Sequence, residues 1–384
     1  MEAYLDNSAT TVPFPSVRDL MIKTLSEDFG NPSSLHKKGF EAEGYMKTAR
    51  EIIAKNLKVN EKEIVFTSGG TESNNMALIG CAMANKRSGM HLITTRIEHA
   101  SVGNVMRYLE ELGFRITYLP VGHDGTVDLV ALEEAICDET IMISVMHVNN
   151  EIGALQPIEE ISKIIKRKKP DILFHVDAIQ SFGKYQIRPK RMGIDLLSVS
   201  GHKIHGPKGT GFLYIRDKVK IKPLILGGGQ QHDMRSGTEN VPGIAGLGEA
   251  VKVVYQDLDS HVKEMYRLKH VLVDALSNLD GVFVNGQPLD QGAPHIVSLS
   301  FKGVRSEVLL HALEEKGVYV SAGSACSSNH PAISGTLKSI GVDKNLLDST
   351  LRFSFGMFTT EEEVLYAAET VKQLVPTLRR FYRA

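Results

Sequence analysis

The sequence predicts an α/β protein built on a mostly parallel sheet with helices on both faces. From about residue 48 to 216, short apolar runs alternate with amphipathic helical patterns, and this alternation is typical of parallel sheets covered by helices. Lys203 follows one of the apolar runs, and Asp177 lies in the run before it. Ligands of such sheets bind at the carboxyl ends of the strands, so we expect these two residues to mark a site.

Within this region, six apolar runs are expected to form strands, namely 63–67, 91–95, 115–119, 141–147, 172–176 and 196–199. Apolar residues at helical spacing between them predict one helix around 102–112 and another around 158–165. Pro157 marks the start of the second helix, and Pro170 lies beyond its end.

Beyond the three glycines at 227–229 the pattern changes. The expected elements are a long helix over 241–279, a strand at 296–301, a strand near 318–321, and a last helix that begins with a capping box of Thr360 and Glu363. We expect the chain to divide within the long helix, near residue 257. This gives a large domain of residues 12–257 and a small α+β domain of residues 1–11 and 258–384.

Composition excludes several classes of protein. The chain has 384 residues, of which 42% are hydrophobic and 23% charged, with a net charge of −1, so no global field favours nucleic acid or an anionic membrane. No apolar stretch approaches the roughly 18 residues of a transmembrane helix. The first residues lack the basic and apolar regions of a signal peptide.

Three cysteines, Cys81, Cys137 and Cys326, cannot all pair within one chain. This argues against a disulfide scaffold and suits the reducing cytoplasm, where we expect the protein to reside. Their spacing gives no zinc motif, and we expect no metal. Cys81 and Cys137 have apolar helical neighbours and are expected to be packing residues.

Lys203 and Asp177 together suit pyridoxal 5'-phosphate (PLP). A held, partly desolvated lysine can form a Schiff base with an aldehyde, and a buried carboxylate can keep a pyridine nitrogen protonated. Taken alone, a lysine after a strand is more often a solvated loop residue, and a strand aspartate is more often an edge or capping residue. The ordered set favours the cofactor, and its members are Asp177, Gln180, Ser200, His202 and Lys203.

A glycine-rich turn at 68–75, containing Gly70 and Thr71, follows a strand and precedes a helix. Backbone N–H groups and the helix N-terminus there can bind an anion, although many such turns are only turns. Ser200 and His202 add donors, and together these residues favour a phosphate site. His99 lies at another strand-to-helix corner, where it either packs or stacks on a ring and shuttles protons.

Two residues near the C-terminus complete the set of candidates. Cys326 lies among small residues that favour an accessible thiol, against the alternative of an incidental loop cysteine. Arg352, in a predicted strand, needs an anionic partner, which is either a structural carboxylate or a substrate carboxylate.

At this point the chain closely resembles the cysteine desulfurases of the NifS/IscS type, PLP enzymes of the fold-type I, class V aminotransferase superfamily. The resemblance covers essentially the whole length. The matching segments are YLDNSATT (4–11), GNPSS (30–34), TSGGTESNN (67–75), EH (98–99), NNEIG (149–153), HVDAIQ (175–180), SGHK (200–203), RSGT (235–238), GSAC (323–326) and LRFS (351–354). Ser8 is a small departure, since the family often has alanine there.

The resemblance implies a PLP-transferase fold with a seven-stranded sheet, a homodimer with two shared sites, and a mobile catalytic cysteine loop at about 323–336. Cys326 should be the nucleophile and Lys203 the Schiff-base lysine. The other implied cofactor contacts are Asp177 to the pyridine nitrogen, Gln180 to the ring hydroxyl, His99 stacked on the ring, and a phosphate site made by Gly70, Thr71, Ser200, His202 and the partner subunit's Thr238. Asn150 and Arg352 should hold the substrate carboxylate.

The expected activity is removal of sulfur from L-cysteine, giving alanine and a persulfide on Cys326 that passes to an acceptor protein. The long segment between Cys326 and Arg352 is similar to the branch that supplies iron–sulfur cluster scaffolds. Three alternatives stay open. They are a selenocysteine lyase acting on L-selenocysteine, a class V aminotransferase that does not need Cys326, and a sulfur-relay scaffold without catalysis.

Overall fold

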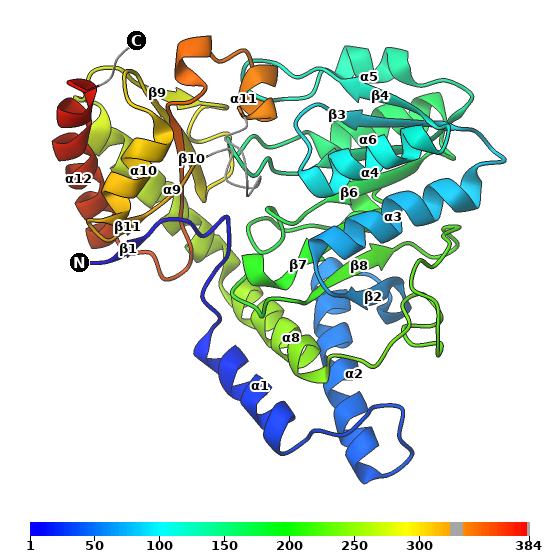
Figure 1. The fold of residues 1–384 in the computed structure, drawn as a ribbon. Helices are drawn as coiled ribbons and strands as arrows, with labels where there is room; N and C mark the ends of the chain where they lie inside the picture. The colour runs from blue at the N-terminus through cyan, green and yellow to red at the C-terminus, as the bar shows by residue number, and fades with distance from the viewer. Residues whose placement is uncertain (323–332, 382–384) are drawn as a thin grey trace.

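The computed structural model describes residues 1–322 and 333–381. Within these residues the largest sheet has seven strands, in the order β2 (Ile64–Thr67), β8 (Gly211–Ile215), β7 (Leu196–Ser200), β6 (Leu173–Asp177), β5 (Thr140–Met146), β3 (His91–Thr95) and β4 (Arg115–Leu119). Strands β7 to β4 run parallel, and β8 is antiparallel to both of its neighbours. The expected mostly parallel sheet is thus confirmed (Figure 1).

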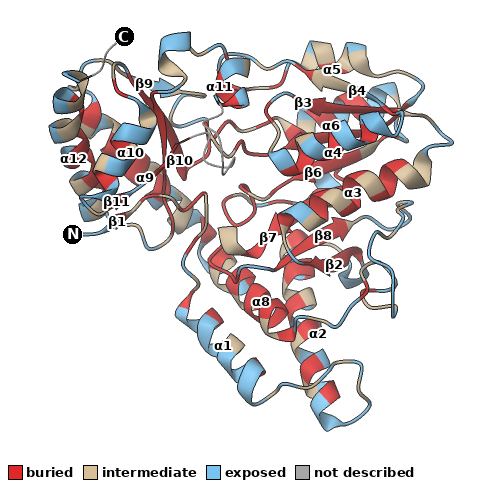
Figure 2. Ribbon diagram, in the orientation of Figure 1, coloured by how far each residue is buried: buried red, intermediate tan, exposed pale blue. Residues whose placement is uncertain are grey.

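Helices cover both faces of this sheet. One face packs on α2 (Lys37–Leu57), α5 (Leu129–Ala135), α6 (Ile158–Lys168) and α8 (Val241–Gln256). The other face packs on α3 (Gly70–Asn85) and α4 (Ala100–Glu111). Neighbouring residues of β2 show the alternation, since Phe66 belongs to the first core and Val65 to the second. Figure 2 shows buried strands between helices whose outer sides are exposed.

A smaller antiparallel sheet lies beside the large one, in the order β12 (Ser321–Ala322), β13 (Thr350–Ser354), β10 (Ile296–Phe301) and β9 (Val282–Asn285). Its apolar core includes side chains of α9 (Leu258–Leu276), α10 (Ser306–Glu314) and α12 (Glu361–Arg379). The N-terminal strand β1 (Ala3–Tyr4) pairs with β11 (Val318–Tyr319). The remaining helices are α1 (Pro15–Ser26), α7 (Pro189–Met192) and α11 (Gly335–Ser339).

Two expected elements differ in the structure. The long helix over 241–279 is two helices, because Asp257 adopts the non-helical angles φ −142° and ψ 51° between α8 and α9. Aspartate favours such breaks since its side chain competes for backbone hydrogen bonds. The strand near 318–321 is likewise divided at Val320 into β11 and β12, which belong to different sheets.

A row of polar side chains crosses the interior of the large sheet. His175 on β6 hydrogen-bonds through Nδ1 to Ser144 Oγ on β5 at 2.8 Å and through Nε2 to Ser198 Oγ on β7 at 3.0 Å. All three are fully buried. Burial lowers the pKa of His175 to about 3, so the ring stays neutral. The row fixes the register of three adjacent strands.

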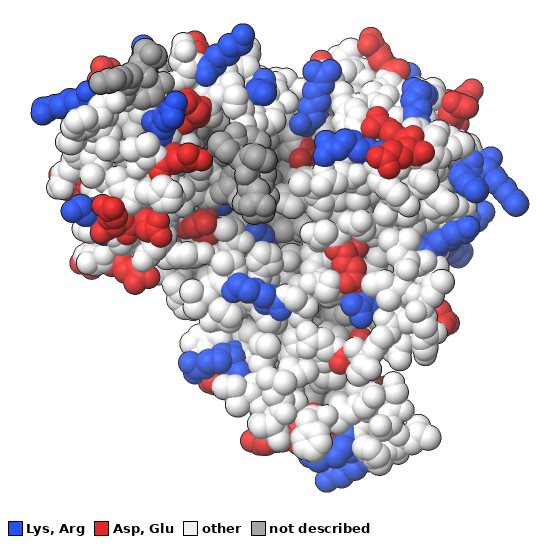
Figure 3. Space-filling view, in the orientation of Figure 1, with Lys and Arg blue, Asp and Glu red and all other residues white. Residues whose placement is uncertain are grey.

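The surface carries both signs of charge. Figure 3 shows acidic and basic side chains interspersed over one face. Among the described helices, none combines the length and apolar character needed to cross a bilayer.

The capping box of α12 provides a test of the fold. Thr360 Oγ1 accepts from the N–H of Glu363, and the Glu363 carboxylate accepts from the N–H of Thr360, as the sequence predicted. Thr360→Ala removes one of these bonds and should lower the free energy of unfolding by about 1 kcal/mol, measured by urea denaturation. Gln373→Ala, on an exposed turn of the same helix, is the control. Equal stability of the two variants would contradict a stabilising role for the cap.

Candidate active site

A cavity of about 460 Å³ lies at the carboxyl ends of the parallel strands, between the two sheets. It gathers ten of the residues singled out in the sequence, namely Gly70, Thr71, His99, Asn150, Asp177, Gln180, Ser200, His202, Lys203 and Arg352. Most of them follow from the fold of the large sheet, because the ends of β3, β5, β6 and β7 meet at one edge, whereas Gly70 and Thr71 begin α3 after β2 and Arg352 comes from β13. Their individual roles remain predictions.

Asp177 ends β6 and is buried in the cavity wall. One carboxylate oxygen accepts from the N–H of Ile179 at 2.9 Å, and the other accepts from Asn74 Nδ2 on α3 at 2.8 Å. Burial raises the pKa of Asp177, and these two donors oppose the rise. A cationic ring nitrogen at this position would further stabilise the carboxylate.

The glycine-rich turn that the sequence predicts to bind a phosphate connects β2 to α3. Gly69 has φ +146°, a conformation that L side chains rarely adopt. The turn brings the first amides of α3, at Gly70 and Thr71, to the cavity, and those amides have no acceptor within a helix. A Cβ on Gly70 would lie 2.1 Å from Ile179 Cδ1. A larger residue here would therefore displace the Ile179 side chain.

Lys203 lies on a short helical turn, Gly201–Lys203, after β7. Its Nζ donates to the carbonyl oxygens of Ser8 and Ala9, the latter at 2.8 Å. Behind it, the buried Lys184 donates from Nζ to the Lys203 carbonyl at 3.1 Å. Burial and the nearby Lys203 cation lower the pKa of Lys184 to about 8. Lys184 lies among ordinary polar residues and carries no motif, so the sequence did not reveal it.

His99 is the N-cap of α4, and its Nδ1 accepts from the N–H of Ser101 at 3.1 Å. Burial lowers the pKa of His99, partly opposed by the Asp177 charge. The imidazole is therefore neutral near pH 7. The adjacent Glu98 joins β3 to β5, since its Oε1 accepts from Thr95 Oγ1 and from the N–H of Met146. Burial raises the pKa of Glu98 to about 8.

Arg352 reaches the cavity from β13 of the small sheet. Its Nη2 pairs with Asp6 at 2.7 Å, and its Nη1 donates to the Asn150 carbonyl at 2.9 Å. Asp6 is thus a structural carboxylate of the kind considered from the sequence. Further N–H groups remain on both Nη atoms, so the guanidinium keeps the capacity to bind a carboxylate. Asp6 had been noted only as part of a motif.

The N-terminal segment forms part of the cavity wall. Ser8 is buried, and its Oγ has no hydrogen-bond partner among the described residues. Its carbonyl also accepts from Gln180 Nε2 at 3.0 Å, while Gln180 Oε1 faces His295 Nε2 at 3.2 Å. The main chain at Ser8 therefore ties Gln180 and Lys203 together, and this role is independent of the side chain at that position.

One predicted residue of the described chain does not line the cavity. Thr238 is exposed and outside it in this chain, and Cys326 falls outside the described residues. Of the other cysteines, Cys81 is a buried packing residue of α3 as expected. The expectation for Cys137 is wrong, because it is partly exposed beyond α5 and accepts a hydrogen bond from Arg115 Nη2 at 3.0 Å. Together with hydrogen bonds from Thr140 and the backbone, this contact lowers the pKa of its thiol.

The residues around the main cavity fit PLP. Asp177 offers a carboxylate to a pyridine nitrogen, Lys203 offers an amine to an aldehyde, and the Gly70–Thr71 turn with Ser200 offers donors to a phosphate.

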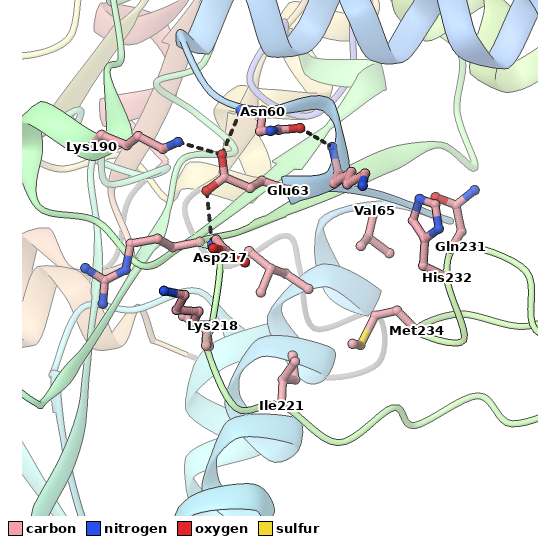
Figure 4. A pocket seen from close by; sticks show the side chains of 14 residues that line it. Asn60, Glu63, Val65, Lys190, Asp217, Lys218, Ile221, Gln231, His232 and Met234 are labelled. Atoms are coloured by element: carbon pink, nitrogen blue, oxygen red, sulfur yellow. Dashed lines mark hydrogen bonds and ion pairs between the residues drawn. The ribbon is translucent and has the colours of Figure 1, made fainter.

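A second cavity, of about 500 Å³, lies on another side of the large sheet (Figure 4). One of its two carboxylates, Glu63, already accepts from Lys190 Nζ and from the N–H groups of Asn60 and Asp217. The other side chains drawn are mainly apolar or cationic, including Val65, Ile221, Met234 and Lys218. The set of groups that suits PLP is found in the first cavity.

Comparison with known proteins agrees with this geometry. The family model described as aminotransferase class-V matches residues 3–366. A protein of Dictyoglomus turgidum named cysteine desulfurase IscS is 44% identical over 98% of this chain and 95% of its own length. The putative cysteine desulfurase IscS 1 of Bacillus subtilis is 45% identical over 98% of this chain and 99% of its own.

Solved structures are similar over nearly the whole chain. A NifS-like protein superposes with a TM-score of 0.93 at 39% identity, covering 98% of this chain and all of its own. A structure titled SspA in complex with cysteine has a TM-score of 0.82 at 36% identity, covering 93% of this chain and all of its own.

The contact between Gly70 and Ile179 is testable. Gly70→Ala should push Ile179 into the cavity and reduce retained PLP about tenfold, measured by absorbance after dialysis. Adding Ile179→Ala should restore retention by making room. Gly103→Ala on α4, where a Cβ meets nothing within 4 Å, is the matched control. Unchanged PLP retention in Gly70→Ala would exclude a tight fit at this turn.

Proposed function

The chain belongs to the class V aminotransferase family and is a PLP-dependent cysteine desulfurase, and we propose that Cys326 is the thiol that accepts the sulfur. The observation that carries this proposal is the joint presence of the PLP-type cavity and of Arg352 within it. Among the three cysteines, Cys81 is buried in α3, and Cys137 lies outside the residues that line the cavity. Cys326 follows closely on Ser321, which lines it.

The substrate is L-cysteine, held by its carboxylate. The guanidinium of Arg352 is fixed by Asp6 and by the Asn150 carbonyl, and its remaining N–H groups suit a carboxylate. Asn150 lies beside it on the cavity wall.

When bound, PLP withdraws electrons from the substrate Cα, the carbon that bears both the amino and the carboxylate group. Asp177 would hold its ring nitrogen, Gln180 its ring hydroxyl, and Gly70, Thr71, Ser200 and His202 its phosphate. Lys203, supported through its backbone by Lys184, would hold the aldehyde carbon and then move a proton at the substrate carbon. The neutral His99 is placed to lie over the ring.

The sulfur transfer is balanced without an oxidant. The Cys326 thiolate attacks the sulfur of L-cysteine, forming a new S–S bond as the bond between that sulfur and Cβ breaks. The electron pair of the broken bond stays on carbon and is protonated there. The products are L-alanine and a persulfide on Cys326. The names of the relatives support this reading over a selenocysteine lyase and over an aminotransferase.

Replacing the proposed nucleophile tests this function. Cys326→Ala should retain PLP and still bind L-cysteine, but sulfide release should fall at least 100-fold because no thiolate attacks the sulfur. The assay incubates the holoenzyme with L-cysteine and a reductant and measures alanine and sulfide.

The other cysteines provide matched controls. Cys81→Ala and Cys137→Ala should release sulfide at the parent rate. Cys137 is the stricter control because hydrogen bonds from Thr140, the backbone and Arg115 lower the pKa of its thiol. Mass spectrometry after one turnover without reductant should locate the added sulfur on Cys326. An adduct on Cys137, or parent-level sulfide from Cys326→Ala, would refute the assignment.

We further propose that two chains form a homodimer that shares its sites. Support comes from the exposed apolar side chains of α1 and the loop after it, Ile22, Leu25, Phe29 and Leu35, together with Leu226. Exposed apolar side chains of this kind favour burial against another protein. Arg235 holds the loop bearing Thr238 against Glu72 of α3 at 2.8 Å, and this leaves Thr238 at the surface.

Subunit complementation tests the sharing of sites. Lys203→Ala and Thr238→Arg each damage a homodimer. If Thr238 acts on the partner's cofactor, a mixed dimer has one site with both native residues and should recover up to half of the parent activity per dimer. If Thr238 acts within its own chain, no native site forms. Light scattering checks the dimer mass, and a fully active monomer would rule the proposal out.

Three further assignments complete the proposal. The sulfur acceptor is a protein of the iron–sulfur scaffold type, a choice supported by the IscS names of the relatives, and the reaction takes place in the cytoplasm. The large domain comprises residues 12–257 and the small domain residues 1–11 and 258–384. The break at Asp257 and the separate apolar core beside the small sheet support this division.

A further inference from the structure

Four side chains form a continuous hydrogen-bonded chain along the wall of the main cavity. Asn74 Nδ2 donates to Asp177 Oδ2 at 2.8 Å and to Ser101 Oγ at 2.9 Å. Ser101 Oγ lies 2.8 Å from His99 Nδ1. Asn74 is fully buried on α3, and Ser101 lies in the first turn of α4. The two helices thus connect the end of β6 to the end of β3.

The direction of every hydrogen bond follows from Asp177. An ionised carboxylate only accepts hydrogen bonds, so the amide nitrogen of Asn74 must face it. The second N–H of that amide then points to Ser101 Oγ, which leaves the hydroxyl hydrogen of Ser101 for His99 Nδ1. The Asn74 carbonyl oxygen, turned away, is buried with no partner among the described residues.

His99 Nδ1 is therefore surrounded by donors. It accepts from the backbone N–H of Ser101 at 3.1 Å as well as from the hydroxyl. A proton on Nδ1 would point at these donors, so the neutral ring carries its proton on Nε2. The cationic ring, with a proton on each nitrogen, is disfavoured by the same two contacts.

We propose that Asn74 and Ser101 are positioning residues that form a relay. This relay passes the hydrogen-bond direction set by Asp177 on to His99 and fixes the His99 ring as the Nε2–H form. His99 then presents a constant hydrogen-bond donor to the cavity. This inference rests on the proposed function for its catalytic consequence, but the state of the ring can be measured independently of turnover. The charged groups facing the ring are Asp177 from β6 and Lys203 from the turn after β7, with Glu98 adjacent in the chain.

The first experiment measures the ring directly. The ¹⁵N shifts of labelled histidine are recorded for the holoenzyme between pH 6 and 9, and His99→Gln identifies the His99 signals. The parent should show one Nε2–H form throughout. Ser101→Ala removes the hydroxyl donor, and Asn74→Ala leaves that hydroxyl free to turn away. In either variant a second form of the His99 ring should appear, or the pKa of His99 should rise by about one unit. An unchanged His99 signal in both variants would overturn the proposal.

The second experiment separates positioning from general stability. Ser101→Ala and Asn74→Ala should each lower kcat for sulfide release about tenfold with KM changed less than about twofold, and the double variant should lose no more than the weaker single variant. Ser101→Thr keeps the hydroxyl and should restore kcat. Additive losses, or no rescue by threonine, would count against the relay.

A matched control variant is available on β3. Thr94 is buried, and its Oγ1 has no hydrogen-bond partner among the described residues, so Thr94→Val removes a nearby hydroxyl without touching the relay and should leave kcat and the His99 signals unchanged. If the parent enzyme releases no sulfide, only the proposed function is refuted. The His99 signals would still test the relay. A change of the His99 signals in Thr94→Val equal to that in Ser101→Ala would overturn the relay.

Discussion

The residues around the cavity are arranged to supply hydrogen bonds to one buried carboxylate at the end of a strand. Asp177 lies in a place where a charge is costly unless donors compensate it. The N–H of Ile179 and the amide of Asn74 provide that compensation, and the proposed contact with the ring nitrogen of PLP would add to it. Helix α3 therefore has two tasks, since its N-terminus faces the phosphate end of the cavity and its second turn supports the opposite end.

The N-terminal segment makes contacts with both sheets. Asp6 pairs with Arg352 of the small sheet, while the carbonyls of Ser8 and Ala9 accept from Lys203 at the edge of the large one. The amine that we propose for the cofactor and the cation that we propose for the substrate are thus fixed to one short stretch of backbone. A displacement of either sheet would change the distance between the two groups.

Six of the seven strands of the large sheet could be predicted because they depend on local patterns, whereas β8 was not among the expected runs. Asp177, Lys203 and the turn at Gly70 could be picked out from the residues, but Asn150 only through the family resemblance. The runs 91–95 and 115–119 match β3 and β4 residue for residue. The break at Asp257 was missed because the apolar pattern continues through it, and Cys137 was misjudged because Arg115 reaches it from a neighbouring strand. Asn74, Ser101 and Lys184 act through contacts between distant segments, which periodicity does not reveal.

Three buried histidines, including His175 of the polar row across the large sheet, lower the stability of the folded protein in acid. His91, His147 and His175 are buried, and burial lowers their pKa values to about 4, 4 and 3. In an unfolded chain they would titrate near 6.5. As the pH falls below that value, the unfolded chain takes up protons that the folded chain refuses. Each of these histidines then costs about 1.4 kcal/mol of stability per pH unit until its folded pKa is reached. The neutral His175 ring that aligns three strands at pH 7 therefore lowers the free energy of unfolding in mildly acidic solution.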